Sequence, residues 1–419
     1  MTPRDDGGGG IRGLRILYLS HRFPYPPAGG AKVRAYHTIK RLAAHNTVTV
    51  AAPVRDAEEL AAAETLAGQG PSVETAPISR AGGLVRTLGS ALTGHTASLG
   101  YFRSPRLIRR VRQLVARGEF DLVVVHSSSV APYVADLVGP TKVLDFVDMD
   151  SRKWLDYTRY TRLPMRLVYA LEGRCLSRIE RRLAAQFDLS VVATAVEAES
   201  LQAIAGTVPY TVVPNGVDLS YFHPTEDAYD PKSLCFVGRM DYFPNVQAMH
   251  RFCAEAWPQV RRAVPSAQLR IVGANPTARV RDLARIAGVE VTGTVDDVRP
   301  YVRAAACTVA PLEIARGTQN KLLESMALGV PVVASPLAAR GVDARAPDHL
   351  LQAAGPTETA QRVVELMTDP QERARLAAAG RAQVESRHDW ARALDRFEHD
   401  LKTILHDHGR VDGAGEWAC

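Results

Sequence analysis

The sequence lacks the features that identify several protein classes. Its five cysteines include no CxxC pair, which argues against a disulfide scaffold or a structural zinc site and fits a reducing cytosol. No apolar run reaches the roughly 20 residues that span a bilayer. The first residues lack the basic and apolar regions of a signal peptide. We therefore expect a cytoplasmic protein, with peripheral contact at the inner face of the membrane left open.

The composition is that of a globular protein. Hydrophobic residues make up 46% of the 419 residues and charged residues 23%, both close to globular averages. These values exclude a mostly disordered chain, a collagen-like repeat and a long coiled coil. The length suggests two or three domains, and the formal charge of +6 is only mildly basic.

Strands and helices are expected to alternate in two series. In the first series, apolar runs predict strands at 15–20, 45–53, 121–126, 142–146 and 189–194, with a helix at 35–44. Turn-forming residues then gather at 206–224. In the second series, strands are expected at 234–237, 268–272, 290–292, 307–310 and 331–334, with helices at 245–256, 277–287 and 320–327.

This alternation is typical of parallel sheets with helices on both faces. We predict an α/β protein with two doubly wound, Rossmann-like domains that face each other across a cleft, where such folds usually bind ligands. The expected divisions are a flexible tail at 1–14, a first domain at 15–205 and a second domain at 206–385. A helix and frayed tail at 386–419 would return toward the first domain.

Two sites in the first domain carry candidate ligand contacts. Gly29 and Gly30 stand between a strand and a helix, where a ligand can approach the backbone and the helix N-terminus favours an anion. His126 closes an apolar strand, and parallel sheets bind ligands at the carboxyl ends of their strands. A plain turn and an ordinary core histidine are the alternatives. The glycines do not form GxGxxG, which argues against a dinucleotide-dependent dehydrogenase.

Two charged segments of the first domain leave alternatives open. Asp145, Asp148 and Asp150 alternate at a strand end, but Asp150 with Ser151 fits a helix cap, and no metal site is expected. Residues 151–182 hold nine basic and three acidic side chains with apolar residues between them, a net charge of +6. Such a segment is either a solvated helix face or a contact with anionic membrane. Nucleic acid is not expected as a partner.

The strongest signal lies in the second domain, where a strand end and a helix start carry polar groups. The residues concerned are Gly238, Arg239, Gly317, Thr318, Gln319, Asn320, Lys321 and Glu324. The helix is expected to open at Gly317 and Thr318, and its N–H groups and positive dipole end favour an anion. Arg239, Lys321 and this helix terminus together predict a diphosphate clamp. Glu324 lies on the helix face of Lys321, where it can accept hydrogen bonds from ribose hydroxyls.

Taken together, these motifs resemble the GT-B glycosyltransferases, specifically the retaining glycosyltransferase family 4. The resemblance covers most of the chain. It rests on RILYLSHRFPYPPAGG, His126, VVPNGVD at 212–218, FVGRMDYFPN at 236–245 and NKLLESMALGVPVVAS at 320–335. The segments HRFPYPP, DFVDMDSRKW and GRMDYFPN are similar to a subgroup of sugar transferases linked to exopolysaccharide and PEP-CTERM gene systems.

The resemblance implies that a sugar moves from a nucleotide diphosphate donor to an acceptor hydroxyl with retention at the anomeric carbon. Arg239 and Lys321 would neutralise the diphosphate, Glu324 would bind the ribose, and His126 would contact the donor sugar. Gly29 and Gly30 would let the phosphate and the acceptor come close. No cofactor beyond the nucleotide-sugar is expected, because the cations replace a metal. The expected acceptor is a lipid-linked glycan or a small molecule.

Two positions depart from the family pattern. An acidic residue that holds sugar hydroxyls usually stands eight positions before Glu324, but Arg316 stands there, with Glu313 as a candidate substitute. The usual lysine shortly after Arg239 is also missing, Asn245 lies nearby, and Lys321 would supply that charge instead. The identity of the donor sugar therefore stays open.

Three other functions share the architecture: a natural-product glycosyltransferase acting on a small aglycone, a sugar-nucleotide 2-epimerase, and a non-catalytic nucleotide-sugar-binding protein. An epimerase needs carboxylates and histidine around the sugar, which Arg316 does not favour. The presence of Arg239, Lys321 and Glu324 together argues against a role in binding alone.

Overall fold

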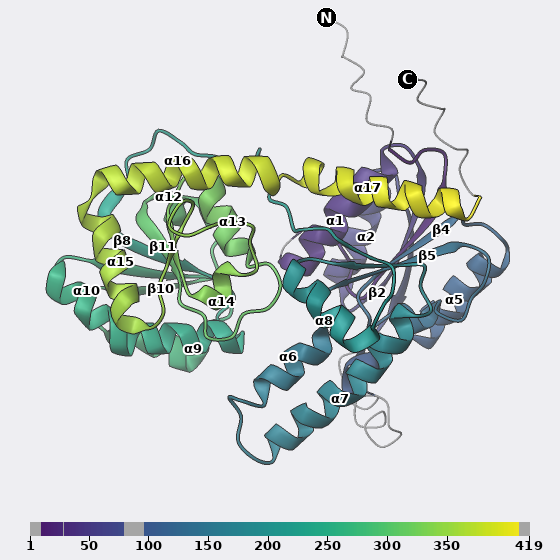
Figure 1. Ribbon diagram of the computed structural model, residues 1–419, viewed down its shortest axis with the longest axis horizontal. Coiled ribbons are helices and arrows are strands. Elements are labelled where there is room, and N and C mark those ends of the chain that lie inside the picture. The colour runs from purple at the N-terminus through teal and green to yellow at the C-terminus, as the bar shows by residue number, and fades with distance from the viewer. Residues whose placement is uncertain (1–9, 28, 79–95, 410–419) are drawn as a thin grey trace, which may run out of the picture. The chain divides into compact units, whose positions relative to one another are not determined.

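The computed structural model describes residues 10–27, 29–78 and 96–409, and these form two compact units (Figure 1). Unit 1 comprises the chain up to Pro214 together with the part from Ala393 onward, and unit 2 runs from Asn215 to Arg392. Most of the tail expected at 1–14, and the end of the tail expected after 386, lie outside the described residues. Ile11 and Leu14 are buried, so packed structure begins earlier than the predicted boundary at residue 15.

Unit 1 is built on a sheet of seven parallel strands in the order β3-β2-β1-β4-β5-β6-β7. The strands are β1 (Arg15–Ser20), β2 (Thr47–Val54), β3 (Ser72–Pro77), β4 (Leu122–His126), β5 (Thr141–Val147), β6 (Leu189–Val192) and β7 (Tyr210–Val212). The helices are α1 (Gly30–Ala43), α2 (Ala57–Ala67), α4 (Ala97–Phe102), α5 (Pro105–Ala116), α6 (Asp150–Tyr157), α7 (Met165–Ala184), α8 (Ala195–Ala205) and α17 (Trp390–Asp407), with a 3-10 turn at Ala131–Tyr133.

Unit 2 is built on six parallel strands in the order β10-β9-β8-β11-β12-β13. The strands are β8 (Asp230–Val237), β9 (Gln268–Val272), β10 (Val289–Gly293), β11 (Ala305–Ala310), β12 (Val332–Ala334) and β13 (Leu351–Gln352). The helices are α9 (Phe243–Arg251), α10 (Trp257–Ala263), α11 (Ala278–Asp282), α12 (Arg299–Arg303), α13 (Asn320–Ala327), α14 (Pro336–Ala339), α15 (Pro356–Thr368) and α16 (Pro370–Arg387). A π-helical turn at Phe252–Ala256 joins α9 to α10, and a 3-10 turn at Leu283–Arg285 follows α11.

Both sheets follow from their apolar strands. All five residues of β4 and all six of β11 are buried, as expected for strands covered by helices on both faces. In each sheet the order of strands reverses once, between β1 and β4 in unit 1 and between β8 and β11 in unit 2. Ligands of doubly wound sheets bind at the carboxyl ends of the strands beside this reversal. The two parallel α/β units confirm the expected fold class.

The predicted boundary at residue 206 differs from the structure. Tyr210–Val212 forms β7 and pairs with β6, so the turn-rich segment begins as part of the sheet of unit 1. The helix expected at 277–287 is instead a short α-helix followed by a 3-10 turn, and the one expected at 245–256 ends in the π-helical turn. After residue 393, α17 packs on unit 1, where Glu398 and Asp395 both pair with Arg41.

Candidate functional site

The strand reversal of unit 2 brings β8 and α13 together around Gly238. A Cβ atom at Gly238 would lie 2.7 Å from the side-chain nitrogen of Asn245 and 3.1 Å from Nζ of Lys321. A side chain at Gly238 would therefore require the Asn245 and Lys321 side chains to shift. The structure therefore places Gly238, from the end of β8, directly against the lysine at the start of α13.

Lys321 is held by a side chain that sequence reasoning did not count as a site residue. Its Nζ donates a hydrogen bond of 2.8 Å to the side-chain oxygen of Asn245 and lies 4.4 Å from the ring centroid of Phe236. The side-chain nitrogen of Asn245 in turn donates to the carbonyl of Arg239 at 2.9 Å. Asn245 thus links the two elements that carry the predicted clamp.

The side chains of Lys321 and Glu324 both have pKa values shifted toward neutral pH. Burial lowers the pKa of Lys321 to about 7, although Glu324 opposes the shift. Burial also raises the pKa of Glu324 to about 7, although Lys321 opposes that shift. A pair of groups with such displaced pKa values at a strand reversal is typical of a functional site. A bound anion would favour the charged form of Lys321.

The backbone carbonyl of Arg239 contacts this cluster, whereas its guanidinium binds a different side chain. Its Nε and one terminal nitrogen donate to the Asp241 carboxylate at 3.1 and 2.6 Å. This hydrogen bonding lowers the pKa of Asp241. The Arg239 side chain is 61% exposed, so it is open to solvent beside its partner. The structure thus brings Gly238, Asn245 and Lys321 together but holds the guanidinium of Arg239 on Asp241.

The loop before α13 corrects one expectation. The helix begins at Asn320 with Gln319 as its N-cap, and Gly317 and Thr318 belong to the preceding loop. Gly317 has a φ of 59°, a left-handed backbone conformation that does not occur within a right-handed α-helix. Among the described residues the buried hydroxyl of Thr318 has no hydrogen-bond partner. The Asn320 side chain accepts a bond of 3.1 Å from Asn215.

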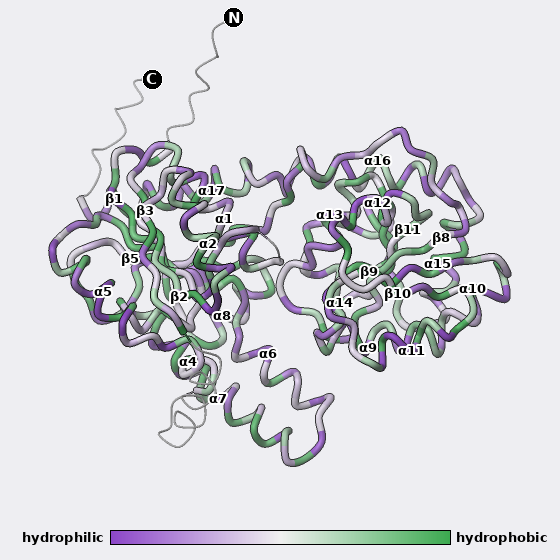
Figure 2. Tube along the Cα trace, turned by 180° about the vertical axis from the view of Figure 1, so that it is seen from behind, coloured by the Kyte–Doolittle hydropathy of each residue, from purple (hydrophilic) through white to green (hydrophobic). Residues whose placement is uncertain are grey.

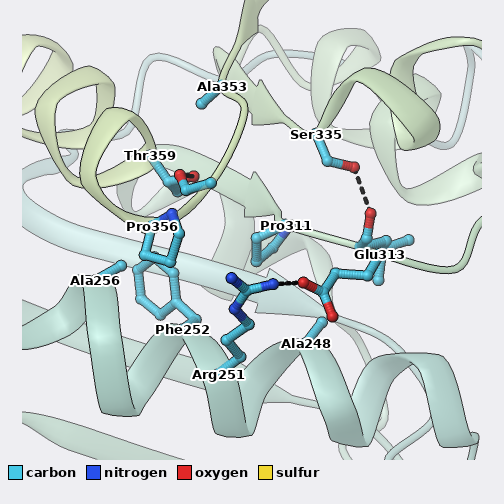
Figure 3. A pocket seen from close by; sticks show the side chains of 12 residues that line it. Ala248, Arg251, Phe252, Ala256, Pro311, Glu313, Ser335, Ala353, Pro356 and Thr359 are labelled. Carbon is cyan, nitrogen blue, oxygen red and sulfur yellow. Dashed lines mark hydrogen bonds and ion pairs between the residues drawn. The ribbon is translucent and has the colours of Figure 1, made fainter. Parts of the chain in front are cut away.

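Glu313, considered as a substitute for the acidic residue missing at position 316, has partners outside this cluster. Its carboxylate accepts a hydrogen bond of 2.9 Å from Gln247 and forms an ion pair with Arg251. Figure 3 shows Glu313 and Arg251 pointing toward each other from two sides of a pocket of about 140 Å³. The pocket is also lined by Pro311, after β11, and Ser335, after β12. The negative charge of Glu313 is therefore balanced by Arg251 of α9.

In unit 1, His126 lies at the strand reversal as expected, opposite Ser20 in the register of β1 and β4. It is fully buried, and its Nδ1 lies 3.3 Å from the carboxylate of Asp145. The same carboxylate accepts bonds of 2.7 and 3.1 Å from Arg34, which also donates to the carbonyl of Val213 at 2.8 Å. Burial disfavours the ionised form of Asp145, but Arg34 and His126 outweigh it and lower the pKa of Asp145.

The far side of the His126 ring has a different character. Among the described residues, Nε2 of His126 is buried without a hydrogen-bond partner. The ring of His21 stacks on it at 5.8 Å between centroids. Burial and the neighbouring His126 and Arg22 hold the pKa of His21 well below its usual range. Asp145 thus orients one nitrogen of His126, and the other is buried with no hydrogen-bond partner among the described residues.

Gly29 and Gly30 also lie where they were expected. Gly29, with a φ of 89°, is the N-cap of α1, and Gly30 is the first residue of that helix. Among the described residues beyond its chain neighbours, no atom lies within 4 Å of a Cβ built at Gly29, so none of these residues crowds the backbone there. The same helix carries Arg34. The sequence analysis missed Arg34 as a functional residue. The signal that could have found it is an arginine on the apolar face of an amphipathic helix.

The aspartates after β5 do not form the expected cap. Helix α6 begins at Asp150 without a side-chain cap, and Glu180 instead accepts hydrogen bonds from the backbone and hydroxyl of Ser151. Burial, with Glu197 and Asp150 nearby, raises the pKa of Asp148 to about 7. Within 10–27, 29–78 and 96–409, no three histidine, cysteine or acidic side chains lie close enough to hold a metal ion.

Comparisons with known proteins concern both units. Residues 29–216 match the family described as "Glycosyl transferase 4-like domain", and residues 231–369 match "Glycosyl transferases group 1". A GDP-mannose-dependent monoacylated alpha-(1-6)-phosphatidylinositol monomannoside mannosyltransferase of Corynebacterium glutamicum is 27% identical over 218 residues, covering 46% of this chain and 55% of that protein. The match thus spans about half the length of that relative. A phosphatidyl-myo-inositol mannosyltransferase of Mycobacterium leprae is 25% identical over 324 residues, covering 74% and 81%.

Solved structures share the architecture of the whole chain. Anabaena HepE, crystallised in complex with UDP and glucose, superposes with a TM-score of 0.68 at 15% identity, over 93% of this chain and 100% of that chain. Sucrose-phosphate synthase of Thermosynechococcus elongatus superposes with a TM-score of 0.67 at 15% identity, over 94% and 100%. At such identities the likeness shows the fold alone, which is GT-B.

Proposed function

Because the chain belongs to the GT-B glycosyltransferases of family 4, we propose that it transfers a sugar from a nucleotide diphosphate donor to an acceptor hydroxyl, with retention at the anomeric carbon. The observation that carries the proposal is the position of Lys321, whose ammonium is held by Asn245 against Gly238 at the N-terminus of α13. A cation and a helix N-terminus at one strand reversal suit a diphosphate.

The cluster in unit 2 would act by stabilising the leaving group. As the bond between the sugar and the phosphate breaks, negative charge grows on the phosphate oxygens. The ammonium of Lys321 and the N–H groups at the start of α13 would balance it. The diphosphate would compete with Asp241 for the exposed guanidinium of Arg239. Glu324, once ionised by the charged Lys321, would accept hydrogen bonds from the ribose.

The chemical step we propose is substitution on the front face of the sugar. The bond from the anomeric carbon to the phosphate oxygen breaks, and a bond to the acceptor oxygen forms on the same face. The proton of the acceptor hydroxyl moves to the departing phosphate, so the step needs no nucleophilic carboxylate. His126 would contact the donor sugar, and its orientation by Asp145 would fix which nitrogen does so.

The acceptor is proposed from the relatives. Both mannosyltransferases act, by their names, on phosphatidylinositol derivatives. We propose a lipid-linked acceptor in glycan or exopolysaccharide synthesis, as in the exopolysaccharide and PEP-CTERM-linked subgroup that the sequence resembles. The proposal includes no metal and no cofactor besides the nucleotide-sugar.

A thermal-shift screen across UDP-, GDP- and dTDP-sugars tests the donor class, because a ligand that binds the folded protein raises its apparent stability by mass action. One donor should stabilise wild type and Lys232→Ala equally, since Lys232 is an exposed lysine at the start of β8. The same donor should shift Lys321→Ala much less. Product analysis with that donor then separates the rivals: a glycoside supports transfer, whereas an epimerised donor or unchanged donor would overturn it.

A further inference from the structure

The loop between α6 and α7 and the first turns of α7 carry an exposed apolar surface, which we call the hairpin tip (residues 159–171). Six of the thirteen large hydrophobic side chains exposed among the described residues lie here. They are Tyr160, Leu163, Met165, Leu167, Val168 and Leu171. Leu163, Leu167 and Leu171 are 68%, 65% and 62% exposed. Apolar side chains gathered on a surface in this way mark a contact with a partner.

The hairpin tip lies beyond the part of α7 that packs on unit 1. The buried residues of α7 begin at Gly173, where a Cβ atom would lie 2.8 Å from the side chain of Leu155 in α6. No residue of α7 before Gly173 is buried. Figure 1 shows the two helices extending away from the sheet of unit 1, and Figure 2 shows hydrophobic segments among hydrophilic ones along them. The tip is therefore not needed to fill the core.

The hairpin tip is also positively charged. It contains Arg159, Arg162 and Arg166 and no acidic residue, and all three arginines are exposed. In the part of the chain that the structure describes, neither Arg162 nor Arg166 forms an ion pair. The next carboxylate, Glu172, accepts hydrogen bonds of 2.9 and 3.0 Å from the first backbone N–H groups of α4, so it does not neutralise the tip. The positive charge of the tip is thus presented to solvent.

Aromatic rings border the tip where it joins the packed part of the hairpin. Trp154 and Tyr157 of α6 lie 5.3 and 6.0 Å from Tyr169 of α7, between ring centroids. Tryptophan and tyrosine are enriched where a protein surface meets the headgroup region of a bilayer. The aromatic rings thus lie at the base of the hairpin tip, beside Leu171 and just before the first buried residue of α7 at Gly173.

We infer that the hairpin tip docks on an anionic lipid bilayer, with the leucines in the headgroup region and the arginines beside lipid phosphates. A second copy of the chain would bring arginines against arginines on the same surface, which disfavours a dimer here. A polyanion without an apolar phase would leave the leucines exposed. The inference does not rest on sugar transfer, because it concerns a surface formed by α6 and α7 alone.

Flotation with lipid vesicles tests the inference on the full chain. Wild type should float with vesicles made of equal parts phosphatidylcholine and phosphatidylglycerol, and much less with phosphatidylcholine alone. Binding should weaken as salt screens the arginines. The double variant Leu167→Asp/Leu171→Asp should bind about tenfold more weakly or worse, and so should Arg162→Gln/Arg166→Gln, because each arginine near an anionic surface contributes to binding.

Two controls on unit 1 match these variants. Val138 is 91% exposed and lies outside the hairpin, so Val138→Asp should float like wild type. Arg106 and Arg109 are exposed on α5, so Arg106→Gln/Arg109→Gln should also float like wild type. Circular dichroism melts establish that every variant is folded. The inference would be overturned if wild type did not float with anionic vesicles, or if the tip variants floated like wild type. A wild-type dimer that the leucine variant converts to monomer without any change in vesicle binding would also overturn it.

Discussion

The ammonium nitrogen of Lys321 lies 2.8 Å from the side-chain oxygen of Asn245, across 76 positions of sequence. The resemblance to family 4 implies a lysine shortly after Arg239, near position 245. In this chain the cation comes from α13 instead and reaches the end of β8 from the opposite element. We propose that Lys321 supplies the charge that this lysine would carry.

An exchange of these two residues tests the relationship. Lys321→Ala should lower turnover about a hundredfold or more, because losing a preorganised donor at developing charge has effects of this size. Adding Asn245→Lys to Lys321→Ala should recover about tenfold of that loss, since it returns an ammonium group from the other side. Product formation with the donor found in the thermal-shift screen measures both. A double variant no faster than Lys321→Ala would show that the two positions do not share a role.

The pH dependence of nucleotide binding follows from the same lysine. Burial lowers the pKa of Lys321 to about 7, so above this pH the ligand-free protein increasingly holds a neutral amine. A bound diphosphate favours the ammonium form and raises that pKa, so binding takes up a proton at pH 8 to 9, where Glu324, with its pKa of about 7, is already ionised. Affinity for a nucleoside diphosphate should therefore fall as the pH rises from about 7 to about 9.

Calorimetric titration in buffers of different ionisation enthalpy measures the proton uptake directly. Lys321→Ala should lose most of the uptake, whereas Lys232→Ala should keep it, since Lys232 is exposed. Affinity that is flat over this pH range, with no proton uptake, would place the charge change elsewhere.

The ion pair of Arg34 and Asp145 should contribute strongly to the stability of unit 1. The two side chains are only 2% and 6% exposed, and Asp145→Asn would leave the guanidinium buried without a counter-charge. Breaking a buried pair in this way costs about 3–5 kcal/mol. Scanning calorimetry of the unfolding transition measures the loss.

The exposed pair of Arg112 and Asp136 provides the comparison. Its side chains are 40% and 60% exposed, so Asp136→Asn should cost about 1 kcal/mol or less. Equal losses for Asp145→Asn and Asp136→Asn would mean that the buried pair is no more important than a surface one.

Sugar transfer should continue when divalent cations are removed. Cationic side chains and helix N–H groups would carry the charge that a metal balances in other sugar transferases. Turnover measured in EDTA should stay close to that measured with added Mg²⁺. A complete loss in EDTA that Mg²⁺ restores would require a metal at the diphosphate.

The elements beside the candidate site were predictable from local sequence. The strand at 268–272 has the predicted bounds, because it is an apolar pattern closed by turn residues. The helix at 320–327 was predicted for the same reason, although it does not open at Gly317 and Thr318. The short strands β7 and β13 were missed, since two or three residues at a sheet edge carry almost no periodic signal.

The partners of the site residues were less predictable, because they depend on tertiary contacts. Gly238, Arg239 and Lys321 were found from their places after a strand and on a helix. The hydrogen bond that joins Lys321 to Asn245, and the ion pair that joins Arg34 to Asp145 across 111 positions, arise only when the sheets are assembled. No local pattern specifies which side chain fills such a position.

The diphosphate site at α13 is tested most directly by calorimetric titration of the protein with UDP, GDP and dTDP at neutral pH. Wild type and Lys232→Ala should bind one of the three with the same affinity. Lys321→Ala should bind it about tenfold more weakly or worse, because the diphosphate loses a half-buried cation. Wild type that binds none of the three, or Lys321→Ala that binds as tightly as wild type, would contradict the assignment.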